Sequence, residues 1–384
     1  MSLEMNTRIT DLTISGIRVF ANKLVDYPEA LNLTIGQPDF SAPEAVKKAA
    51  AQAILEDRTG YSGNAGLLEL RQAAASFFKD KYDCRYDPET EIIVTNGASQ
   101  ALDAVLRTIL LPGDEFIIPA PMYAGYVPVI RSIGAKAVFL DTTDTNFQPS
   151  VERLKALVTP NTKAIMFNYP TNPTGALIDH DVMDEIVAFL KDKDLYIISD
   201  EIYSENSFGQ EHKSFGSYPE IKDRLFLIHG LSKSHAMTGY RIGFLMGHQR
   251  LIEQAVKVSA FNILCASVPS QHGAIAALTE CRDTPKDMNK SYIERRDYVY
   301  NRLVNMGVDV QKPEGAFYIF PSIKKYGMTS EQFATRLMAE GGVGVVPGSA
   351  FSQLGEGYLR ITYAYAMETL ELAMDRMEAF IKSL

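Results

Sequence analysis

The sequence of 384 residues contains no tryptophan and only three cysteines. The cysteines form no close pair, and neither they nor the six histidines have metal-ligand spacing, so we expect reduced thiols and no metal centre. Long hydrophobic runs are also missing. The most apolar helical stretch, residues 101–111, is interrupted by Asp103 and Arg107, and no signal-like run opens the chain. We therefore expect no membrane partner and a cytoplasmic location.

Positive charge is scarce. The chain has 38 lysines and arginines against 47 aspartates and glutamates, which gives a formal net charge of -9 without any basic cluster. A nucleic acid or an anionic membrane requires a basic surface, so neither is an expected partner. A small anionic substrate would depend on individual arginines. Repeats, low-complexity tracts and long linkers are absent as well.

The sequence does contain 46% hydrophobic residues, in a chain long enough for two structural units. Strand patterns alternate with helix patterns from about residue 91 to 246, which predicts a mostly parallel sheet between helices. Further helices and short strand-like runs follow, the latter at residues 316–320, 343–346 and 358–363. We expect a large domain over residues 45–285 and a smaller α+β domain built from both chain ends, residues 1–44 and 286–384.

The most informative segment runs from Leu231 to Arg241. Lys233 offers an amine that can condense with an aldehyde, while the Ser232 hydroxyl and the Arg241 guanidinium can hold a phosphate. These three groups suit pyridoxal phosphate, an aldehyde that carries a phosphate. Since a Ser-Lys pair alone is usually solvated surface, the prediction depends on further segments.

Residues 196–203 supply a second part of the pattern. Their apolar run predicts a buried parallel strand that ends at Asp200, where open α/β sheets build their sites. A carboxylate there can keep a pyridine nitrogen protonated, and Tyr203 can reach the phenolic oxygen of the same ring. The alternative for Asp200 is a helix N-cap.

Residues 168–175 place Asn172 in a loop with two prolines and a glycine after the strand-like run 163–167. The restricted backbone would present the Asn172 amide as a donor to a ring oxygen, although Asn-Pro is also an ordinary turn. We expect Pro121 and Pro173 to follow cis peptide bonds, which tight turns at sites often use.

A third junction lies after the strand-like residues 91–95. The small residues Ala98 and Ser99 precede a helix pattern, and a helix N-terminus with small side chains leaves backbone N–H groups free to bind a phosphate. This segment is neither a Walker loop nor a dinucleotide fingerprint.

In order and spacing, these segments resemble the class I and II aminotransferases, which are pyridoxal-phosphate enzymes of fold type I, over essentially the whole chain. The resemblance implies an aspartate-aminotransferase-like α/β fold with a mostly parallel seven-stranded sheet between helices, and a two-fold homodimer with shared sites. It also implies catalytic roles for Lys233 as the Schiff-base lysine, Asp200 as the partner of the pyridine nitrogen and Tyr203 as a ligand of the ring hydroxyl oxygen.

The same resemblance implies the other contacts. The phosphate would be held by Ala98, Ser99, Ser232 and Arg241. The ring would be stacked by Tyr123 and its hydroxyl oxygen bound by Asn172, while Tyr61 would reach the phosphate of the neighbouring subunit. The substrate would meet Gly36, Asn172 and Arg360, the last of these gripping its α-carboxylate. Alternatively, Tyr61 and Tyr123 are core aromatics and Arg360 belongs to a surface ion pair.

The implied reaction is a ping-pong transfer of an amino group between an L-amino acid and a 2-oxo acid, with Lys233 as the base. Residues 33–40 and 230–239 are most similar to enzymes that use N-acetyl-L,L-2,6-diaminopimelate and 2-oxoglutarate in lysine biosynthesis. The alternatives are an aromatic or aspartate aminotransferase, or a pyridoxal-phosphate C–S lyase. An effector domain of a transcription regulator is not expected, because the family pattern begins near residue 14 and leaves no room for a helix-turn-helix.

One position bears on the substrate. A subgroup of aspartate-using relatives has a lysine where this chain has Ser99, so a distal carboxylate would need another cation here. Arg18 is a candidate for that cation, and an exposed helix charge is the alternative.

Overall fold

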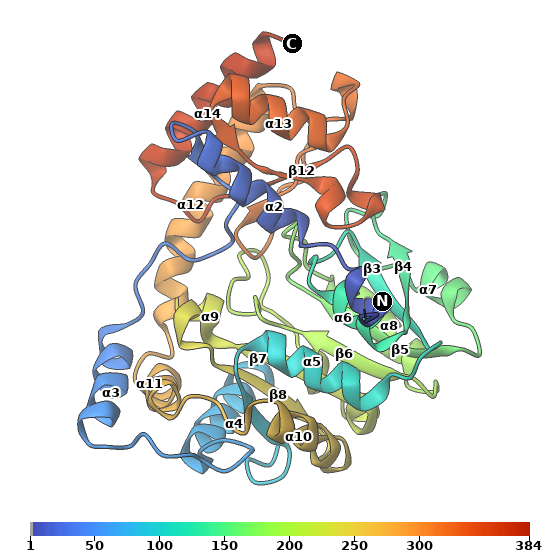
Figure 1. Ribbon diagram of the computed structural model, residues 1–384, viewed down its shortest axis with the longest axis vertical. Helices are drawn as coiled ribbons and strands as arrows, with labels where there is room; N and C mark the ends of the chain where they lie inside the picture. The colour runs from blue at the N-terminus through green and yellow to red at the C-terminus, as the bar shows by residue number, and fades with distance from the viewer. Residues whose placement is uncertain (1–2) are drawn as a thin grey trace.

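A seven-stranded sheet forms the centre of the computed structural model, which describes residues 3–384 (Figure 1). Its strand order is β2-β8-β7-β6-β5-β3-β4, and only β8 runs antiparallel to its neighbours. The strands are β2 (Ile92–Thr95), β3 (Glu115–Ala120), β4 (Lys136–Asp141), β5 (Thr162–Asn168), β6 (Tyr196–Asp200), β7 (Leu225–Gly230) and β8 (Gly243–Gly247). The predicted mostly parallel, seven-stranded sheet is confirmed.

Helices cover both faces of this sheet, which explains why its central strands are apolar along nearly their whole length. Three hydrophobic clusters lie between the sheet and these helices. The helices are α3 (Glu44–Leu55), α4 (Leu68–Tyr82), α5 (Ala98–Ile109), α6 (Tyr126–Ile133), α7 (Val151–Leu157), α8 (His180–Leu190), α10 (Gln249–Ile263) and α11 (Val268–Thr279).

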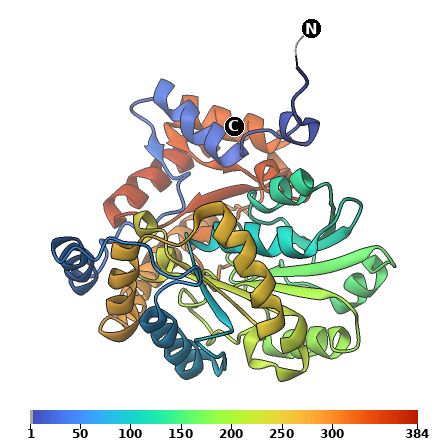
Figure 2. The same ribbon diagram turned by 60° about the horizontal axis from the view of Figure 1, so that its bottom comes forward.

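The two ends of the chain pack together in a second unit, where α2 (Gly16–Lys23) lies beside the C-terminal helices (Figures 1 and 2). β1 pairs with β10, and β11, β12 and β9 form an antiparallel sheet. Phe20, Leu24 and Leu33 from the N-terminus share one hydrophobic core with residues beyond 287. The elements are α2 (Gly16–Lys23), β1 (Leu31–Asn32), α12 (Thr284–Asn305), β9 (Tyr318–Ile319), α13 (Ser330–Gly341), β10 (Val343–Gly344), β11 (Val346–Pro347), β12 (Leu359–Thr362) and α14 (Met367–Lys382).

Short helices connect these elements: α1 (Thr7–Thr10), α9 (Leu231–Ser234), η1 (Leu24–Asp26), η2 (Phe215–Ser217), η3 (Pro219–Arg224), η4 (Thr238–Tyr240), η5 (Lys324–Tyr326), η6 (Gly348–Ala350) and η7 (Gln353–Gly355). The domain division at residues 44/45 and 285/286 stays a prediction, and residues 1 and 2 of its small domain lie outside the described residues. Within residues 3–384, no helix has both the length and the apolar character needed to cross a bilayer.

The sheet topology brings several loops to one edge. β5, β6 and β7 are parallel neighbours whose carboxyl ends lie side by side, with Asn168 opposite Asp200 and Asp200 opposite Ile228. The chain enters α5 and α9 from the same edge. In such sheets this edge is where ligands bind.

The peptide bonds before Pro121 and Pro173 are cis, as predicted. The bond between Tyr169 and Pro170 is also cis, and we did not expect this from the sequence.

Candidate active site

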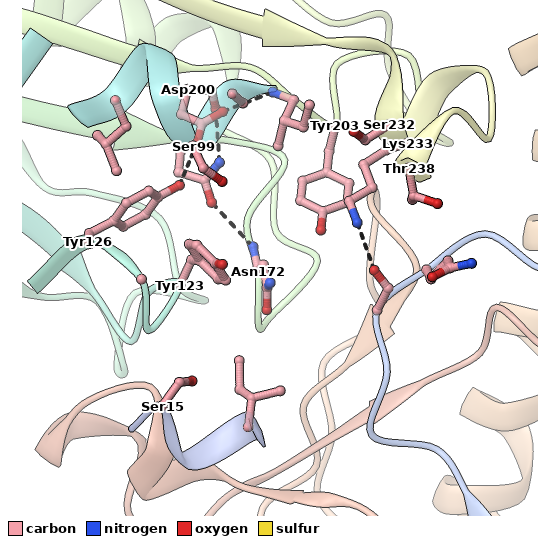
Figure 3. A pocket seen from close by; sticks show the side chains of 18 of the residues that line it. Ser15, Ser99, Tyr123, Tyr126, Asn172, Asp200, Tyr203, Ser232, Lys233 and Thr238 are labelled. Carbon is pink, nitrogen blue, oxygen red and sulfur yellow. Dashed lines mark hydrogen bonds between the residues drawn. The ribbon is translucent and has the colours of Figure 1, made fainter. Parts of the chain in front are cut away.

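A cavity of about 570 Å³ lies between the carboxyl edge of the sheet and the N-terminal segment (Figure 3). All predicted site residues except Tyr61 line it, and so does Arg18. The predicted residues in the cavity are Gly36, Ala98, Ser99, Tyr123, Asn172, Asp200, Tyr203, Ser232, Lys233, Arg241 and Arg360. In the described part of the chain, no cluster of histidine, cysteine, aspartate or glutamate side chains is arranged to hold a metal ion.

Lys233 lies on α9, immediately after β7, and its amine points into the cavity (Figure 3). Nζ donates a hydrogen bond of 2.7 Å to the carbonyl oxygen of Gly36. Burial, together with the positive charges of Arg360 and Arg241, lowers the pKa of Lys233 to about 8. A substantial fraction of this amine is therefore neutral, and so nucleophilic, near pH 7 to 8.

Asp200 ends β6 with its carboxylate buried at the cavity wall. Oδ2 accepts a 2.7 Å hydrogen bond from the Tyr126 hydroxyl, and Oδ1 accepts one of 3.2 Å from the Ile202 N–H. Burial raises the pKa of Asp200 to about 6, although both hydrogen bonds oppose the rise. Among residues 3–384, no lysine or arginine forms a salt bridge with this carboxylate, so a cationic ligand would stabilise it.

The N-cap alternative for Asp200 is wrong, because the residues after it form turns rather than a helix. The bond from the Ile202 N–H is instead that of an Asx-turn.

Tyr203 shares a hydrogen bond of 2.8 Å with the hydroxyl of Tyr318, which comes from β9 in the second unit. Gly36 lies directly against Tyr318. A Cβ at position 36 would be 1.9 Å from the Tyr318 hydroxyl oxygen, so only glycine fits there without a shift. The contact between Gly36 and Tyr318 places the N-terminal segment at the wall of the cavity.

Arg360 on β12 is 1% exposed, although its side chain is a guanidinium. Nη1 donates a hydrogen bond of 3.0 Å to Oδ1 of Asn172, Nη2 donates to the carbonyl oxygen of Thr34, and Nε is without a partner. Within the described range no carboxylate pairs with it. The surface ion-pair alternative is therefore wrong, and a buried guanidinium of this kind is suited to an anionic ligand.

Arg241 and the start of α5 form the other end of the cavity. Gly97 is the N-cap of α5 with φ +80°, and a Cβ there would lie 2.4 Å from Nη2 of Arg241. This glycine therefore lets the guanidinium approach the positive helix end. The Ser99 and Ser232 side chains line the same cavity, and these groups together make a site for a phosphate or another anion.

The two tyrosines predicted to contact the cofactor, Tyr61 and Tyr123, lie in different places. Tyr123 lines the cavity, 38% exposed, with its ring edge-to-face against Tyr126 at 5.2 Å between centroids. Tyr61 is 86% exposed and lies outside the cavity. Neither is a core aromatic, so that alternative is wrong for both.

Several cavity residues were missed by sequence reasoning. Tyr126 holds Asp200, and Asn168 donates from Nδ2 to the Asp200 carbonyl oxygen at 2.9 Å. Asn168 belongs to the predicted segment 168–175 and Tyr126 lies three residues after Tyr123, but no spacing rule identifies the partners of either residue. The other missed polar residues in the cavity are Ser15, Gln37, Thr238 and Tyr318.

Comparison with known proteins agrees with this geometry. Residues 28–377 match the family model described as aminotransferase class I and II. The chain is 48% identical to a probable N-acetyl-LL-diaminopimelate aminotransferase of Bacillus subtilis, over 98% of this chain and 95% of the relative. It is 40% identical to aromatic-amino-acid aminotransferase 2 of Thermococcus litoralis, over 99% of each chain.

Among solved structures, the aspartate aminotransferase of Thermus thermophilus with maleate superposes with a TM-score of 0.94 at 32% identity, covering 98% of this chain and 100% of the other. The expected aspartate-aminotransferase-like fold is thereby confirmed. The chain belongs to the class I and II aminotransferases.

Proposed function

We propose that this aminotransferase uses pyridoxal 5'-phosphate to move an amino group between an L-amino acid and a 2-oxo acid by a ping-pong mechanism. One observation carries the proposal: a single cavity brings together a lysine of lowered pKa, a buried carboxylate and two arginines that have no carboxylate partner within residues 3–384.

The cavity fits this cofactor. Asp200 would meet the pyridine nitrogen, whose positive charge would compensate a carboxylate buried without a cation. Asn172, whose Oδ1 is engaged by Arg360, keeps its amide N–H groups for the ring oxygen, alongside Tyr203. The phosphate would lie at the start of α5 against the side chains of Ser99, Ser232 and Arg241. Tyr123 would stack on the ring.

When bound, the cofactor supplies an aldehyde for the lysine and a ring that accepts electrons. The protein supplies the proton transfers. Lys233 Nζ takes the α-proton of the substrate as a neutral amine, and its pKa of about 8 makes both of its protonation states accessible at neutral pH. Tyr126 keeps Asp200 oriented and favours its charged form.

Arg360 would let both substrates of the ping-pong reaction use the same cavity. Its fork would bind the α-carboxylate that amino acid and oxo acid have in common, so both half-reactions can use one cavity in turn. Since Asn172 and Thr34 hold the guanidinium in place before substrate arrives, little ordering remains to be done on binding.

We further propose a homodimer in which Tyr61 serves the neighbour's phosphate. Phe261 is 92% exposed, and Ile263 and Leu264 are also exposed. The Asn64 amide donates a 3.0 Å hydrogen bond to the Leu264 carbonyl oxygen, so the loop carrying Tyr61 lies next to this apolar group. A second copy of the chain is the partner that would cover both.

For the domains, we propose that residues 45–285 bind the cofactor, while residues 1–44 and 286–384 contribute Arg360 and close the cavity. Arg360 and Lys233 then belong to different domains. A closure between the domains would bring the substrate carboxylate towards the reacting amine.

N-acetyl-L,L-2,6-diaminopimelate with 2-oxoglutarate is the substrate pair that we propose, because the 48% identical relative bears the name of that activity. Relatives named for aromatic amino acids and for aspartate are 40% and 39% identical. These remain the second candidates, and a C–S lyase remains the third.

A panel of amino donors tested against several oxo acids distinguishes these candidates. The change in cofactor absorbance measures the first half-reaction, and the amount of new amino acid formed measures the second. The proposal predicts the highest kcat/KM for acetylated diaminopimelate with 2-oxoglutarate. Faster transfer from phenylalanine or aspartate would favour the second candidates, and release of pyruvate and sulfide from cysteine without transfer would identify a lyase.

A further inference from the structure

Four cationic side chains line the cavity: Arg18, Lys233, Arg241 and Arg360. The proposed function uses three of them, and each of these three is held by the protein. Lys233 donates to Gly36, Arg241 donates to the Thr238 carbonyl oxygen at 3.0 Å, and Arg360 donates to Asn172 and Thr34. Over residues 3–384 the Arg18 guanidinium has neither a hydrogen bond nor an ion pair.

The position of Arg18 is fixed by close packing of its helix. A Cβ at Gly16 would lie 2.7 Å from the Cβ of Ala350, so the first turn of α2 fits closely against η6. Four residues later Phe20 is buried in the core of the second unit. Between these two anchors, Arg18 lies in the first turn of α2 and lines the cavity.

Ser15 adds a second donor at the same place. It is the N-cap of α2, yet its hydroxyl makes no capping hydrogen bond to the helix. It lines the cavity across from Asp200 and Ser99 (Figure 3). Hence a hydroxyl and a guanidinium are both present at the wall contributed by α2, where they could bind the same anion.

Apolar side chains line the cavity together with these donors, namely Ile17, Ile35, Leu102 and Val129. Apolar lining accommodates methylene groups, whereas the polar groups of a cavity fix the orientation of a ligand. With the α-carboxylate at Arg360, the far end of a substrate side chain would lie within reach of the other groups of the same cavity, which include those of α2. The lining thus suits a substrate with a carboxylate at each end.

We propose that Arg18, assisted by Ser15, binds the distal carboxylate of dicarboxylic amino and oxo acids. The inference rests on the proposed function, since it needs Arg360 to hold the other carboxylate. Arg18 would also supply the cation that the uncharged Ser99 does not provide for a distal carboxylate. Because Arg18 stays accessible to solvent, its effect is that of one screened, charge-assisted contact.

Binding of unreactive acids to the holoenzyme tests this directly. Titration calorimetry would compare succinate, glutarate, adipate and pimelate with monocarboxylates of the same chain lengths, for wild type and Arg18→Ala. We expect Arg18→Ala to weaken the best-bound dicarboxylate about tenfold and its matched monocarboxylate less than twofold. Equal weakening of both acids, or an unchanged dicarboxylate, would overturn the proposal.

Matched variants distinguish the loss of the Arg18 charge from a general effect of changing α2. Lys23→Ala removes a cation from the last turn of the same helix, where Lys23 pairs with Glu331, and should leave all affinities unchanged. Arg18→Lys should keep part of the preference, and Arg18→Glu should reverse it in favour of the monocarboxylate. A loss with Lys23→Ala as large as that with Arg18→Ala would refute a specific contact.

Failure of the proposed function is visible separately. If the chain were not a pyridoxal-phosphate transaminase, no cofactor spectrum and no amino transfer would be found with any pair. The heats of binding do not depend on turnover, so the preference for a second carboxylate can fail while transamination holds.

Discussion

The hydroxyl of Tyr126, at the start of α6, donates a hydrogen bond of 2.7 Å to Oδ2 of Asp200, at the end of β6. Both side chains are buried. Burial raises the pKa of Asp200, and this bond acts in the opposite direction. Tyr126 therefore helps to keep a negative charge in an apolar setting, and we assign it a positioning role.

Replacing Tyr126 by phenylalanine should raise the pKa of Asp200 further and weaken cofactor binding about tenfold, since one charge-assisted hydrogen bond is lost. The measurements are the dissociation constant of the cofactor and the pH titration of its absorbance. Tyr169→Phe is the matched control, because it removes a buried hydroxyl that donates to the Phe147 carbonyl oxygen outside the cavity. The same loss in both variants would contradict a specific role for Tyr126.

Asp200→Asn should stabilise the cofactor-free protein at neutral pH. The folded-state pKa of Asp200, about 6, exceeds the ordinary aspartate pKa of 3.8, so the folded state binds more protons than the unfolded state between these values. Stability therefore falls as pH rises from about 4 to 6, and the asparagine variant escapes that loss. We expect a gain of up to about 3 kcal/mol at pH 7.5 and almost none at pH 4 in urea unfolding.

The same variant should bind the cofactor more weakly, because the ring nitrogen loses its anionic partner. An asparagine variant that is less stable at both pH values would contradict the assigned electrostatics.

Attachment of pyridoxal phosphate to Lys233 should accelerate with pH up to about 8 and then level off, because the neutral amine is the reactive form. Arg360→Gln removes a positive charge that lowers this pKa and should move the midpoint upward. Stopped-flow absorbance after mixing with cofactor measures both midpoints. Identical profiles for the two proteins would show that Arg360 does not influence the amine.

Mixing a chain that lacks Tyr61 with a chain that lacks Lys233 should give more activity than either parent has alone, if Tyr61 serves the neighbouring subunit. In a hybrid of Tyr61→Ala and Lys233→Ala chains, one site receives both intact residues and the other receives neither. With random pairing about half of the dimers are hybrids with one good site, so roughly a quarter of wild-type activity should return. No recovery after subunit exchange would place Tyr61 in its own chain's site, or outside any site.

Much of the site follows from strand ends. Asn172 lies in a loop after β5, Asp200 is the last residue of β6, and Lys233 lies on α9 directly after β7; parallel strands bring their carboxyl ends to one edge. Local sequence therefore predicts both the fold and the grouping of these residues.

Contacts between the two units could not be predicted in this way. Tyr318 reaches Tyr203 across 115 residues of sequence, and Arg360 reaches the Thr34 carbonyl oxygen across 326. An apolar run of residues also does not specify which strand it will pair with. The predicted strand at residues 343–346 is in fact two strands, in which Val343 pairs with Leu31 in one sheet and Val346 pairs with Arg360 in another.

The alternative for Arg18 shows the same limit. Arg18 is an exposed helix residue, and the packing of Gly16 against Ala350 and of Phe20 in the core explains why its turn also lines the cavity. Whether a helix residue lines a cavity depends on packing between distant segments, and the local sequence pattern does not specify that packing.

Borohydride reduction of the holoprotein, followed by peptide mapping, tests the central claim most directly. Reduction fixes the cofactor to the amine that carries it. We expect a single pyridoxyl group on the peptide that contains Lys233, and no label in Lys233→Ala. Label on another lysine, or no label at saturating cofactor, would contradict it.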